Sequence, residues 1–350
     1  MITGTFSRKL SNNLNKIRLP QHTRTSFFAD RRLVFIEGID TVKFLQGLAA
    51  NKVVAGEPKY SAFLNAKGRV LFDALLYPLD LRQRTQLVDN VQGQGDAFAI
   101  EIDATRAAAF LQHLQRFQLR AKVRLAPVDP SRWCVQATWN DTREDSSDDG
   151  LVDTREHLIT SPLTQLWDPR FPETNNVRRA IVPPTSAPAQ ELSMEAYKAF
   201  RIQKGVAEGQ REIISGEAFP LESNFDKLHG VHFQKGCYLG QELTYRSYQR
   251  GTTRKRILPF QLSKRPDDFS KRISYSSSPF SVPAANELSL SEATGTDAST
   301  QTRTRRGPGR VLTTQGNIGL GLIRLDYIDQ VLRWGELFLK PYRPPFLLDD

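Results

Sequence analysis

Apolar residues recur along this chain in short runs that have the length and composition of strands. Runs of this kind occupy 33–38 and 96–103. Residues 60–78 predict two strands joined by a tight turn at Asn65–Gly68, and residues 122–128 predict another strand. These segments indicate a sheet in the first part of the chain.

A regular alternation of apolar and polar positions predicts a further strand over 132–139. Its apolar residues Trp133, Val135, Ala137 and Trp139 would lie on one face of a sheet. Elsewhere the apolar spacing is helical. Asp40 is expected to cap a helix through 43–51, and Thr105 to cap another directly after it. Ser193 is expected to begin a third helix, and Gly205 to end it.

Other segments lack periodicity. Residues 140–150 read as an acidic surface loop, 169–190 as a proline-rich connection and 263–309 as a flexible insertion rich in Ser, Thr and Pro. Residues 310–328 predict a hairpin around Gln315–Asn317, and 334–346 predict a last strand with an ordered tail. The pattern favours an α+β body followed by a small β domain.

Composition is that of a globular protein, with 39% hydrophobic and 25% charged residues among 350 and a formal net charge of +10. No apolar run approaches the roughly 18–20 residues that span a bilayer, so membrane insertion is not expected. Residues 1–29 are basic and contain no acidic residue, as in a mitochondrial targeting segment. A basic disordered tail is the alternative.

The two cysteines, Cys134 and Cys237, are far apart in sequence, which argues against a disulfide scaffold and a four-cysteine zinc site. No HExxH, P-loop or GxSxG pattern occurs. A basic stripe interleaved with aromatic residues is not evident either, so nucleic acid is not an expected partner.

Five blocks occur in an order that is characteristic of one family. They are LVFIEGIDTVKFLQGLAANKV, YSAFLNAKGRVLFDALLYP, AYKAFRIQKGVAEG, FPLESNFD and KGCYLGQELTYR. Together they resemble the folate-binding, aminomethyltransferase-like family of YgfZ type, in its branch of mitochondrial iron–sulfur cluster assembly factors. The resemblance covers about residues 30–260 and 310–340. Its most specific element is the KGCYxGQE block, which the related glycine-cleavage T-proteins lack.

The resemblance implies an aminomethyltransferase-like cloverleaf of two mixed α+β subdomains in 30–250, around a central opening. A C-terminal β-barrel follows in 251–350, and the insertion 263–309 has no counterpart in compact bacterial members. The implied function is maturation of four-iron four-sulfur proteins in the mitochondrial matrix, together with A-type carrier proteins. Such a protein is an adaptor more than an enzyme.

The KGCYxGQE block defines a thiol site centred on Cys237. Gly236 and Gly240 allow the backbone to bend closely, and a helix opening at Gln241 would place the thiol before unpaired amides that favour thiolate. Cys237 would then be a reactive thiol or a soft metal ligand; the alternative is a small residue that fills a turn. The remaining residues of the site are Lys235, Tyr238 and Glu242.

A single thiolate cannot hold an iron–sulfur cluster, which normally needs about four. Cys134 lies in an apolar, aromatic strand and is expected to serve packing. His229 and His232 could assist Cys237, although surface positions are the plainer explanation. If the chain handles a cluster, a partner must supply most of the ligands. Lys235, Arg246 and Arg250 are expected to flank the surface where that partner docks.

A second set of residues concerns folate. Glu222 matches the family position whose carboxylate holds the amino-pyrimidine edge of a pterin, an edge that offers two N–H donors. Asn224 would stabilise the loop. Asp73 falls where the aminomethyltransferases carry their catalytic carboxylate, but it could simply pair with an arginine. Arg254 and Arg256 could meet the anionic glutamate tail of tetrahydrofolate or form a solvated strand edge.

Three functions remain open at this point. The first is a cluster-assembly adaptor that uses Cys237 together with a carrier and shares an iron–sulfur cluster with it transiently. The second is a tetrahydrofolate-dependent aminomethyl transferase. The third is a folate-binding scaffold in which the cysteine is structural. The first is favoured, because the KGCYxGQE block belongs to that branch and not to the transferases.

Overall fold

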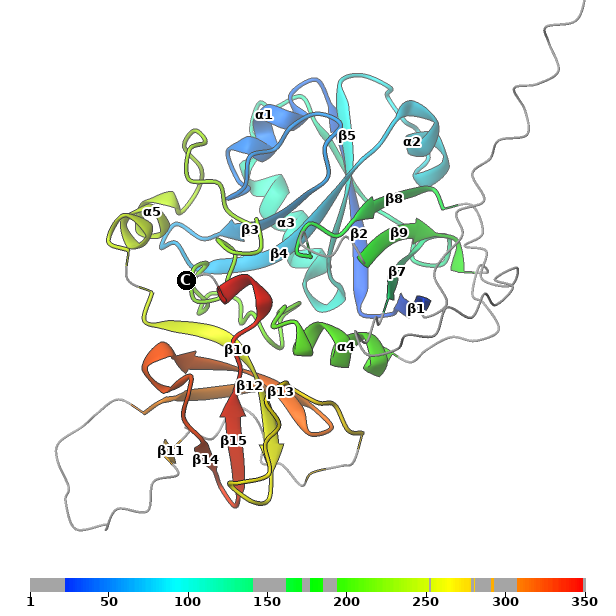
Figure 1. The fold of residues 1–350 in the computed structure, drawn as a ribbon. Helices are drawn as coiled ribbons and strands as arrows, with labels where there is room; N and C mark the ends of the chain where they lie inside the picture. Colours follow the sequence, from blue (N-terminus) through cyan, green and yellow to red (C-terminus); the bar gives the residue numbers. More distant parts are fainter. Residues whose placement is uncertain are drawn as a thin grey trace, which may run out of the picture.

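Antiparallel sheets organise the computed structural model shown in Figure 1. The structure describes residues 23–140, 162–171, 177–184, 194–251, 253–277, 280, 291–292 and 307–348. Within these ranges the chain forms a five-stranded, a four-stranded and a six-stranded sheet. The first two sheets and most of the helices lie in the upper part of Figure 1, and the six-stranded sheet lies below them.

The five-stranded sheet has the order β3-β4-β5-β2-β6 and contains the strands predicted in the first part of the chain. Leu33 and Phe35 of β2 point into one core, whereas Val34 and Ile36 point into another. Burial on both faces explains why this strand is apolar without alternation. The strand bounds are β2 Arg31–Gly38, β3 Lys59–Leu64, β4 Val70–Pro78, β5 Asp96–Asp103 and β6 Arg124–Pro127.

Two helices, α1 (Thr41–Gln46) and α3 (Ala107–Gln118), cover the sheet face that carries Val34 and Ile36. Their predicted caps were confirmed only in the position of Asp40. Asp40 stands at the N-cap position of α1, but its carboxylate accepts the N–H of Lys122 instead of a helix N–H. The other helix is preceded by a 3₁₀ turn, η1 (Ala104–Arg106), whose cap is Asp103 and not Thr105.

The four-stranded sheet has the order β1-β7-β9-β8. The alternating strand is confirmed as β7, with Val135, Ala137 and Trp139 buried. The bounds are β1 Thr23–Phe28, β7 Cys134–Asn140, β8 Thr164–Trp167 and β9 Val177–Val182.

Two sequence boundaries change in this sheet. Residues 23–28 were assigned to the targeting-like segment, yet they form β1 and pair with β7. The connection predicted over 169–190 was wrong in its middle, because 177–182 forms β9 between β7 and β8. Residues 1–22 of the targeting-like segment lie outside the described residues, as do 141–150 of the acidic loop.

The helix predicted after Ser193 is confirmed as α4 (Met194–Gln203), although Ser193 itself lies outside the described residues. Its Tyr197 ring lies 4.8 Å from the Phe28 ring and 5.4 Å from the Trp139 ring, so the helix packs on the four-stranded sheet. Gly205 ends the helix with φ of +74°. Another short helix, α2 (Leu81–Leu87), has a capping box formed by Asp80 and Gln83.

The six-stranded sheet, in the order β11-β14-β15-β10-β13-β12, forms the C-terminal domain. The predicted hairpin is confirmed, since β12 pairs with β13 across Gly316. Leu258, Phe260 and Leu262 of β10 enter a core enclosed by this sheet. The bounds are β10 Lys255–Ser263, β11 Ser291–Glu292, β12 Gly309–Gln315, β13 Ile318–Arg324, β14 Leu332–Trp334 and β15 Leu337–Pro341, with 3₁₀ turns at Leu325–Tyr327 and Pro345–Leu347.

The beginning of the predicted insertion 263–309 is held on this sheet. Asn317 accepts the N–H of Ser276 at 2.6 Å and donates to the carbonyl of Ser274 at 2.9 Å. Apart from 280, 291–292 and 307–309, the segment after residue 277 lies outside the described residues. Among the helices that are described, none is long and apolar enough to cross a membrane.

Buried ion pairs join the two upper sheets. Arg31 of β2 contacts Glu101 of β5 at 2.9 Å, and Arg179 of β9 contacts the same carboxylate at 3.2 Å. Arg170 binds Asp168 at 2.6 Å and Glu208, in the segment after α4, at 2.7 Å. These side chains are largely excluded from solvent, so each charge depends on its partners.

Glu208 is the carboxylate that several of these arginines share, because Arg179 also binds it. Burial alone would raise the pKa of Glu208. The field of Arg179, Arg170, Arg31 and Arg201 outweighs burial and holds that pKa well below its usual range. The group is therefore charged in the folded protein at neutral pH.

Replacing Glu208 by glutamine should lower the free energy of unfolding by about 3–5 kcal/mol at neutral pH, because buried arginines lose a charge partner. Since the folded-state pKa lies below the unfolded value of roughly 4.3, the difference from wild type should shrink as pH falls through that lowered pKa. Urea unfolding at several pH values measures it.

The control is Asp89→Asn, which removes an exposed ion pair with Arg132 and should change stability by less than about 1 kcal/mol. An equal, small effect of both substitutions would contradict a structural role for the buried pairs.

Candidate functional site

The only cysteine that the described residues place at the surface is Cys237. It lies on the loop that leads into α5 (Gln241–Gln249), at the left of Figure 1. Gly240 is the N-cap of α5, so Cys237 lies three residues before the cap and is not the capping group. The expected reactivity of its thiol stays a prediction.

Lys235 lies two residues before Cys237 and is buried. Its Nζ donates to the carbonyls of Gln46 at 2.8 Å, Ala49 at 2.6 Å and Asn51 at 2.9 Å. Burial lowers the pKa of Lys235 to about 8. The expectation that Lys235 flanks an exposed docking surface was therefore wrong, because its ammonium group is used inside the protein.

Two glycines bring the start of α5 against the β3–β4 turn. Gly240 has φ of +78°, and a Cβ added there would lie 2.3 Å from the carbonyl oxygen of Asn65. Gly68 has φ of +74°, and its added Cβ would lie 2.9 Å from Cβ of Leu243. Gly236, by contrast, has open space around it. The close contact therefore depends on Gly240 and Gly68.

An open groove of about 660 Å³ runs beside this contact. The β3–β4 turn contributes Ala66 to it, and the cysteine loop and α5 contribute Tyr238, Gly240, Gln241, Glu242, Tyr245, Arg246 and Gln249. Tyr245 is exposed, and so is Tyr248, whose ring stacks on that of Phe233 at 3.6 Å. Burial raises the pKa of Tyr238 to about 12, so this phenol stays neutral.

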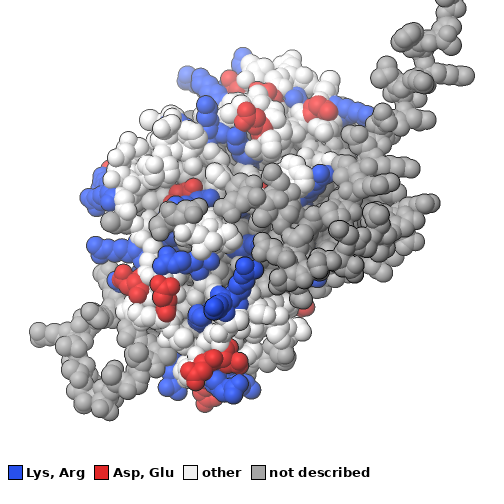
Figure 2. Space-filling model, viewed as in Figure 1, with Lys and Arg blue, Asp and Glu red and all other residues white. Residues whose placement is uncertain are grey.

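The sequence placed Tyr238, Gln241 and Glu242 at the thiol site, and the structure brings them together along the groove. Glu242 is largely exposed and pairs with Arg246 at 2.5 Å, one helical turn further on. Arg250 is exposed at the end of the same helix. Figure 2 shows basic side chains on the outer side of α5, at the left of the view.

A second cavity, of about 620 Å³, lies between the upper body and the C-terminal sheet. The β3–β4 turn contributes Lys67 and Arg69 to its lining, the segment before residue 224 contributes Glu217, Phe219 and Glu222, and the C-terminal sheet contributes Lys255 and Arg310. Figure 2 shows basic and acidic side chains together along this junction.

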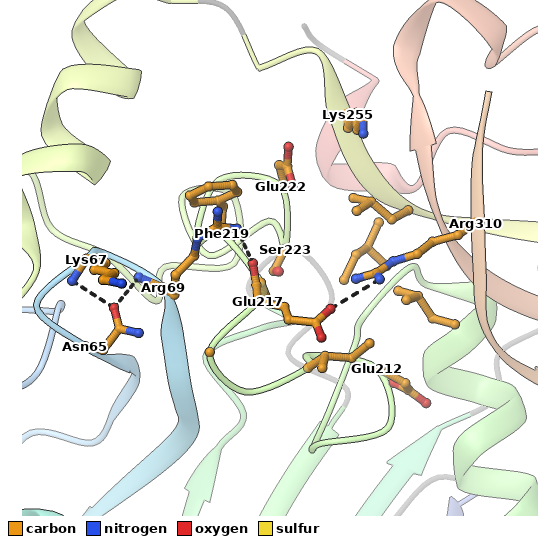
Figure 3. Close-up of a pocket in the computed structure, with 16 residues that line it drawn as sticks. Asn65, Lys67, Arg69, Glu212, Glu217, Phe219, Glu222, Ser223, Lys255 and Arg310 are labelled. Atoms are coloured by element: carbon orange, nitrogen blue, oxygen red, sulfur yellow. Dashed lines mark hydrogen bonds and ion pairs between the residues drawn. The ribbon is translucent and has the colours of Figure 1, made fainter. Parts of the chain in front are cut away.

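Glu222 and Lys255 lie on one side of this cavity in Figure 3, and Glu217 pairs with Arg310 at 3.3 Å on the other. The guanidinium of Arg69 stacks on the ring of Phe219 at 3.6 Å. Burial raises the pKa of Glu222, whereas Lys255, Arg69 and Arg310 act in the opposite direction. The cavity thus combines one half-buried carboxylate with several cations.

The remaining residues expected to bind folate lie elsewhere. Asn224 is buried and holds the loop, donating to the carbonyl of Ile257 at 2.7 Å. Arg256 is buried in a two-point ion pair with Asp226. Arg254 is exposed and is absent from the lining of the cavity. Of the residues predicted to contact folate, Glu222 alone lines this cavity.

Asp73 does not line the cavity either. It is buried, accepts the N–H of Gly209 at 3.2 Å and lies 3.6 Å from Arg31. Burial raises the pKa of Asp73, and Arg31 opposes that rise. Pairing with an arginine, the alternative that the sequence left open, is the role that its contacts support.

Other residues near Cys237 make local contacts. His232 accepts the N–H of Gln234 through Nδ1, and the carbonyl of His229 accepts from Asn51. Cys134 lies in β7, where its thiol donates to the carbonyl of Val182. Within the described ranges, no three His, Cys, Asp or Glu side chains group so as to hold a metal ion.

Comparison with known proteins places the chain among assembly factors. Residues 254–347 match the family described as CAF17, C-terminal beta-barrel domain. The iron–sulfur cluster assembly factor IBA57 homolog, mitochondrial, of Aspergillus oryzae is 34% identical over 334 residues, covering 88% of this chain and 71% of that protein. Proteins of the same name from Pyricularia oryzae and Neurospora crassa are 34% and 35% identical to this chain. Both alignments cover 87% of this chain, and they cover 73% of the Pyricularia protein and 71% of the Neurospora protein.

The chain belongs to the IBA57 family. The aminomethyltransferase T of the glycine cleavage system from Bartonella henselae has a similar structure, with a TM-score of 0.59, covering 93% of this chain and 86% of that chain. At 12% sequence identity this likeness concerns the fold alone. The predicted α+β, aminomethyltransferase-like fold with a C-terminal β-barrel is confirmed.

Some cavity residues of this IBA57 family member escaped the sequence analysis. Arg310 and Lys255 come from the C-terminal sheet, and Glu217 lies just before the FPLESNFD block. Only the packing of the barrel against the body brings these three residues together. Phe219 could have been found from the sequence, because it is the first residue of the FPLESNFD block.

Gly240→Ala should destabilise the protein by about 2–4 kcal/mol, because it adds a clash with the carbonyl of Asn65 to the strain of a left-handed backbone. The matched control is Gly216→Ala. Gly216 has the same φ of +78° but nothing within 4 Å of an added Cβ, so only the backbone strain of about 1–2 kcal/mol applies.

Thermal and urea unfolding of both variants measure the difference. Equal losses at the two glycines would show that the close approach of α5 to the β3–β4 turn has no energetic weight.

Proposed function

We propose that this chain is a mitochondrial iron–sulfur cluster assembly factor in which Cys237 supplies one ligand to a cluster held by a partner. The observation that carries the proposal is an exposed thiol on an anchored loop in a member of the IBA57 family. The relatives' names give the process and the organelle. The mitochondrial matrix is the compartment we propose.

The number of available thiols dictates a shared site. An iron–sulfur cluster normally binds about four thiolates, and Cys134 uses its thiol within the sheet of β7 and β9. A carrier that contributes three cysteines needs one more ligand. We therefore propose an A-type carrier as the partner, with its cluster ligands facing Cys237.

Surface features next to Cys237 suit a docked protein. Tyr245 and Tyr248 are exposed aromatic side chains, a type enriched at protein interfaces. Arg246 and Arg250 add positive charge that would offset the negative charge of a thiolate-bound cluster, although Glu242 neutralises part of it. The role of the chain is then that of an adaptor, and no catalytic turnover is required.

Cys237→Ser should abolish the shared cluster formed on anaerobic mixing with a cluster-loaded A-type carrier, because serine preserves size but is a poor soft-metal ligand. Absorption and circular dichroism of the cluster, with native mass measurement of the complex, read the result. Cys134→Ser is the control and should leave the spectrum unchanged.

Unchanged unfolding of Cys237→Ser must accompany the loss. The complex should also weaken as salt rises if Arg246 and Arg250 contribute. A normal shared spectrum with Cys237→Ser, together with normal maturation of four-iron enzymes, would refute ligation by this residue.

A second proposal concerns the cavity lined by Glu222. We propose that it binds the pterin of tetrahydrofolate, with the Glu222 carboxylate accepting two N–H groups. Its volume is that of a small-molecule site, and Lys67, Lys255 and Arg310 suit an anionic tail. Aminomethyl transfer is not proposed, because Asp73 is buried among ion pairs outside this cavity.

Glu222→Gln should weaken tetrahydrofolate binding by at least tenfold in calorimetry, because an amide cannot accept two N–H groups as a carboxylate does. Glu57→Gln is the control, because Glu57 is an exposed carboxylate outside the cavity, and it should bind normally. Binding to wild type should fall as pH drops through the raised pKa of Glu222, since the protonated acid loses the pairing.

Equal affinities of wild type and Glu222→Gln would remove Glu222 from the ligand site. Measurable methylene transfer by the wild-type chain would instead restore the transferase hypothesis.

A further inference from the structure

The loop that carries Cys237 is attached to one short segment of the body. We call residues 232–239 the cysteine loop and residues 46–51, which begin at the last residue of α1, the receiving segment. The receiving segment runs from the end of α1 toward β3 and lies far from the loop in sequence. Its backbone carbonyls point at the loop, and the loop supplies the donors.

The largest share of these contacts belongs to Lys235. An ammonium group has three N–H donors, and Nζ of Lys235 meets three carbonyls of the receiving segment, those of Gln46, Ala49 and Asn51, at 2.6–2.9 Å. The group also lies 4.9 Å from the centre of the Tyr238 ring. The three carbonyl dipoles offset part of the cost of burying the cation, and burial still lowers its pKa to about 8.

Backbone contacts attach the loop on both sides of the thiol. The N–H of Leu239 donates to the carbonyl of Gly47 at 3.0 Å, and the N–H of His232 donates to that of Ala50 at 3.1 Å. Between Lys235 and Leu239, Gly236 and Cys237 are exposed, and nothing lies within 4 Å of a Cβ built on Gly236. The chain is thus fixed two residues before and two residues after the thiol.

We propose that Lys235 is the positioning residue for Cys237: its three hydrogen bonds to residues 46–51 fix where the thiol stands at the protein surface. A loop that is already held in place loses less conformational entropy when its thiol binds a partner's cluster than a mobile loop would lose. The link to cluster binding rests on the proposed function, whereas the effect on the loop does not.

Lysine suits this position better than arginine. Three carbonyls converge on one nitrogen, and the compact ammonium can donate to all of them at once. The planar guanidinium spreads its donors over a fork and would need more space. Lys235→Arg should therefore not hold the cysteine loop in its wild-type position.

A nitroxide spin label on Cys237 tests the proposal in the full chain, with Cys134→Ala removing the other thiol. The label on otherwise wild-type protein should show restricted motion. In Lys235→Met, which keeps the length of the side chain but removes the ammonium group, the label should tumble several-fold faster. Lys264→Met is the control, because Lys264 is exposed directly after β10 in the C-terminal domain, and it should leave the spectrum unchanged.

The wild-type measurement keeps the test decisive even if Lys235→Met fails to fold. A label that moves as freely on the wild-type protein as on an unfolded chain overturns the proposal, and so does an unchanged spectrum in folded Lys235→Met. Circular dichroism and urea unfolding establish that the variants are folded.

A cluster assay links the loop to the proposed function. With an A-type carrier, Lys235→Met should reduce formation of the shared cluster at least fivefold, and adding Cys237→Ser should give no more loss than Cys237→Ser alone. Normal cluster formation by folded Lys235→Met overturns the positioning role. If the wild-type chain itself forms no shared cluster, the proposed function fails, while the label still decides whether Lys235 holds the loop.

Discussion

The buried ion pairs around Glu208 are the interaction on which the arrangement of the body depends. Their members come from β2, β4, β5, β9 and the segments after β8 and α4, so no single sheet could satisfy them. Charges excluded from water are tolerable only when their partners are all in place. The two upper sheets and the segment after α4 must therefore assemble in one relative position.

The body holds the β3–β4 turn where it contributes to both the cavity and the groove beside Cys237. Residues 65–68, between β3 and β4, contribute Asn65 and Lys67 to the cavity with Glu222, whereas Ala66 lines the groove beside Cys237. Gly68 meets the start of α5 from the same turn. The groove beside Cys237 and the cavity thus share one turn in their linings, and the pairing of β3 with β4 holds that turn in place.

The sequence predicted most of the strands because their apolar runs have the length and composition of strands, and it found the thiol site because the KGCYxGQE block is specific. It missed β9, since Pro183 and Pro184 directly follow a short strand and drew it into a proline-rich connection. The sequence analysis assigned Lys235 to the surface, because its three carbonyl partners lie nearly 190 residues away and the residues around Lys235 do not indicate them. The cavity escaped for a similar reason, as Arg310 reaches it only through the packing of the barrel.

Asp73 shows that the place of a residue in a family pattern does not by itself define its role. The family resemblance puts this residue where transferases keep a catalytic carboxylate, yet here its contacts with Arg31 and Gly209 make it part of the folded interior. The stability of the body is sufficient to explain a buried aspartate with these partners, whether or not the chain transfers a methylene group. An aspartate at this position in a newly sequenced relative is therefore poor evidence for transferase activity, and the exposed loop around Cys237 is the better place to look for what the relative does.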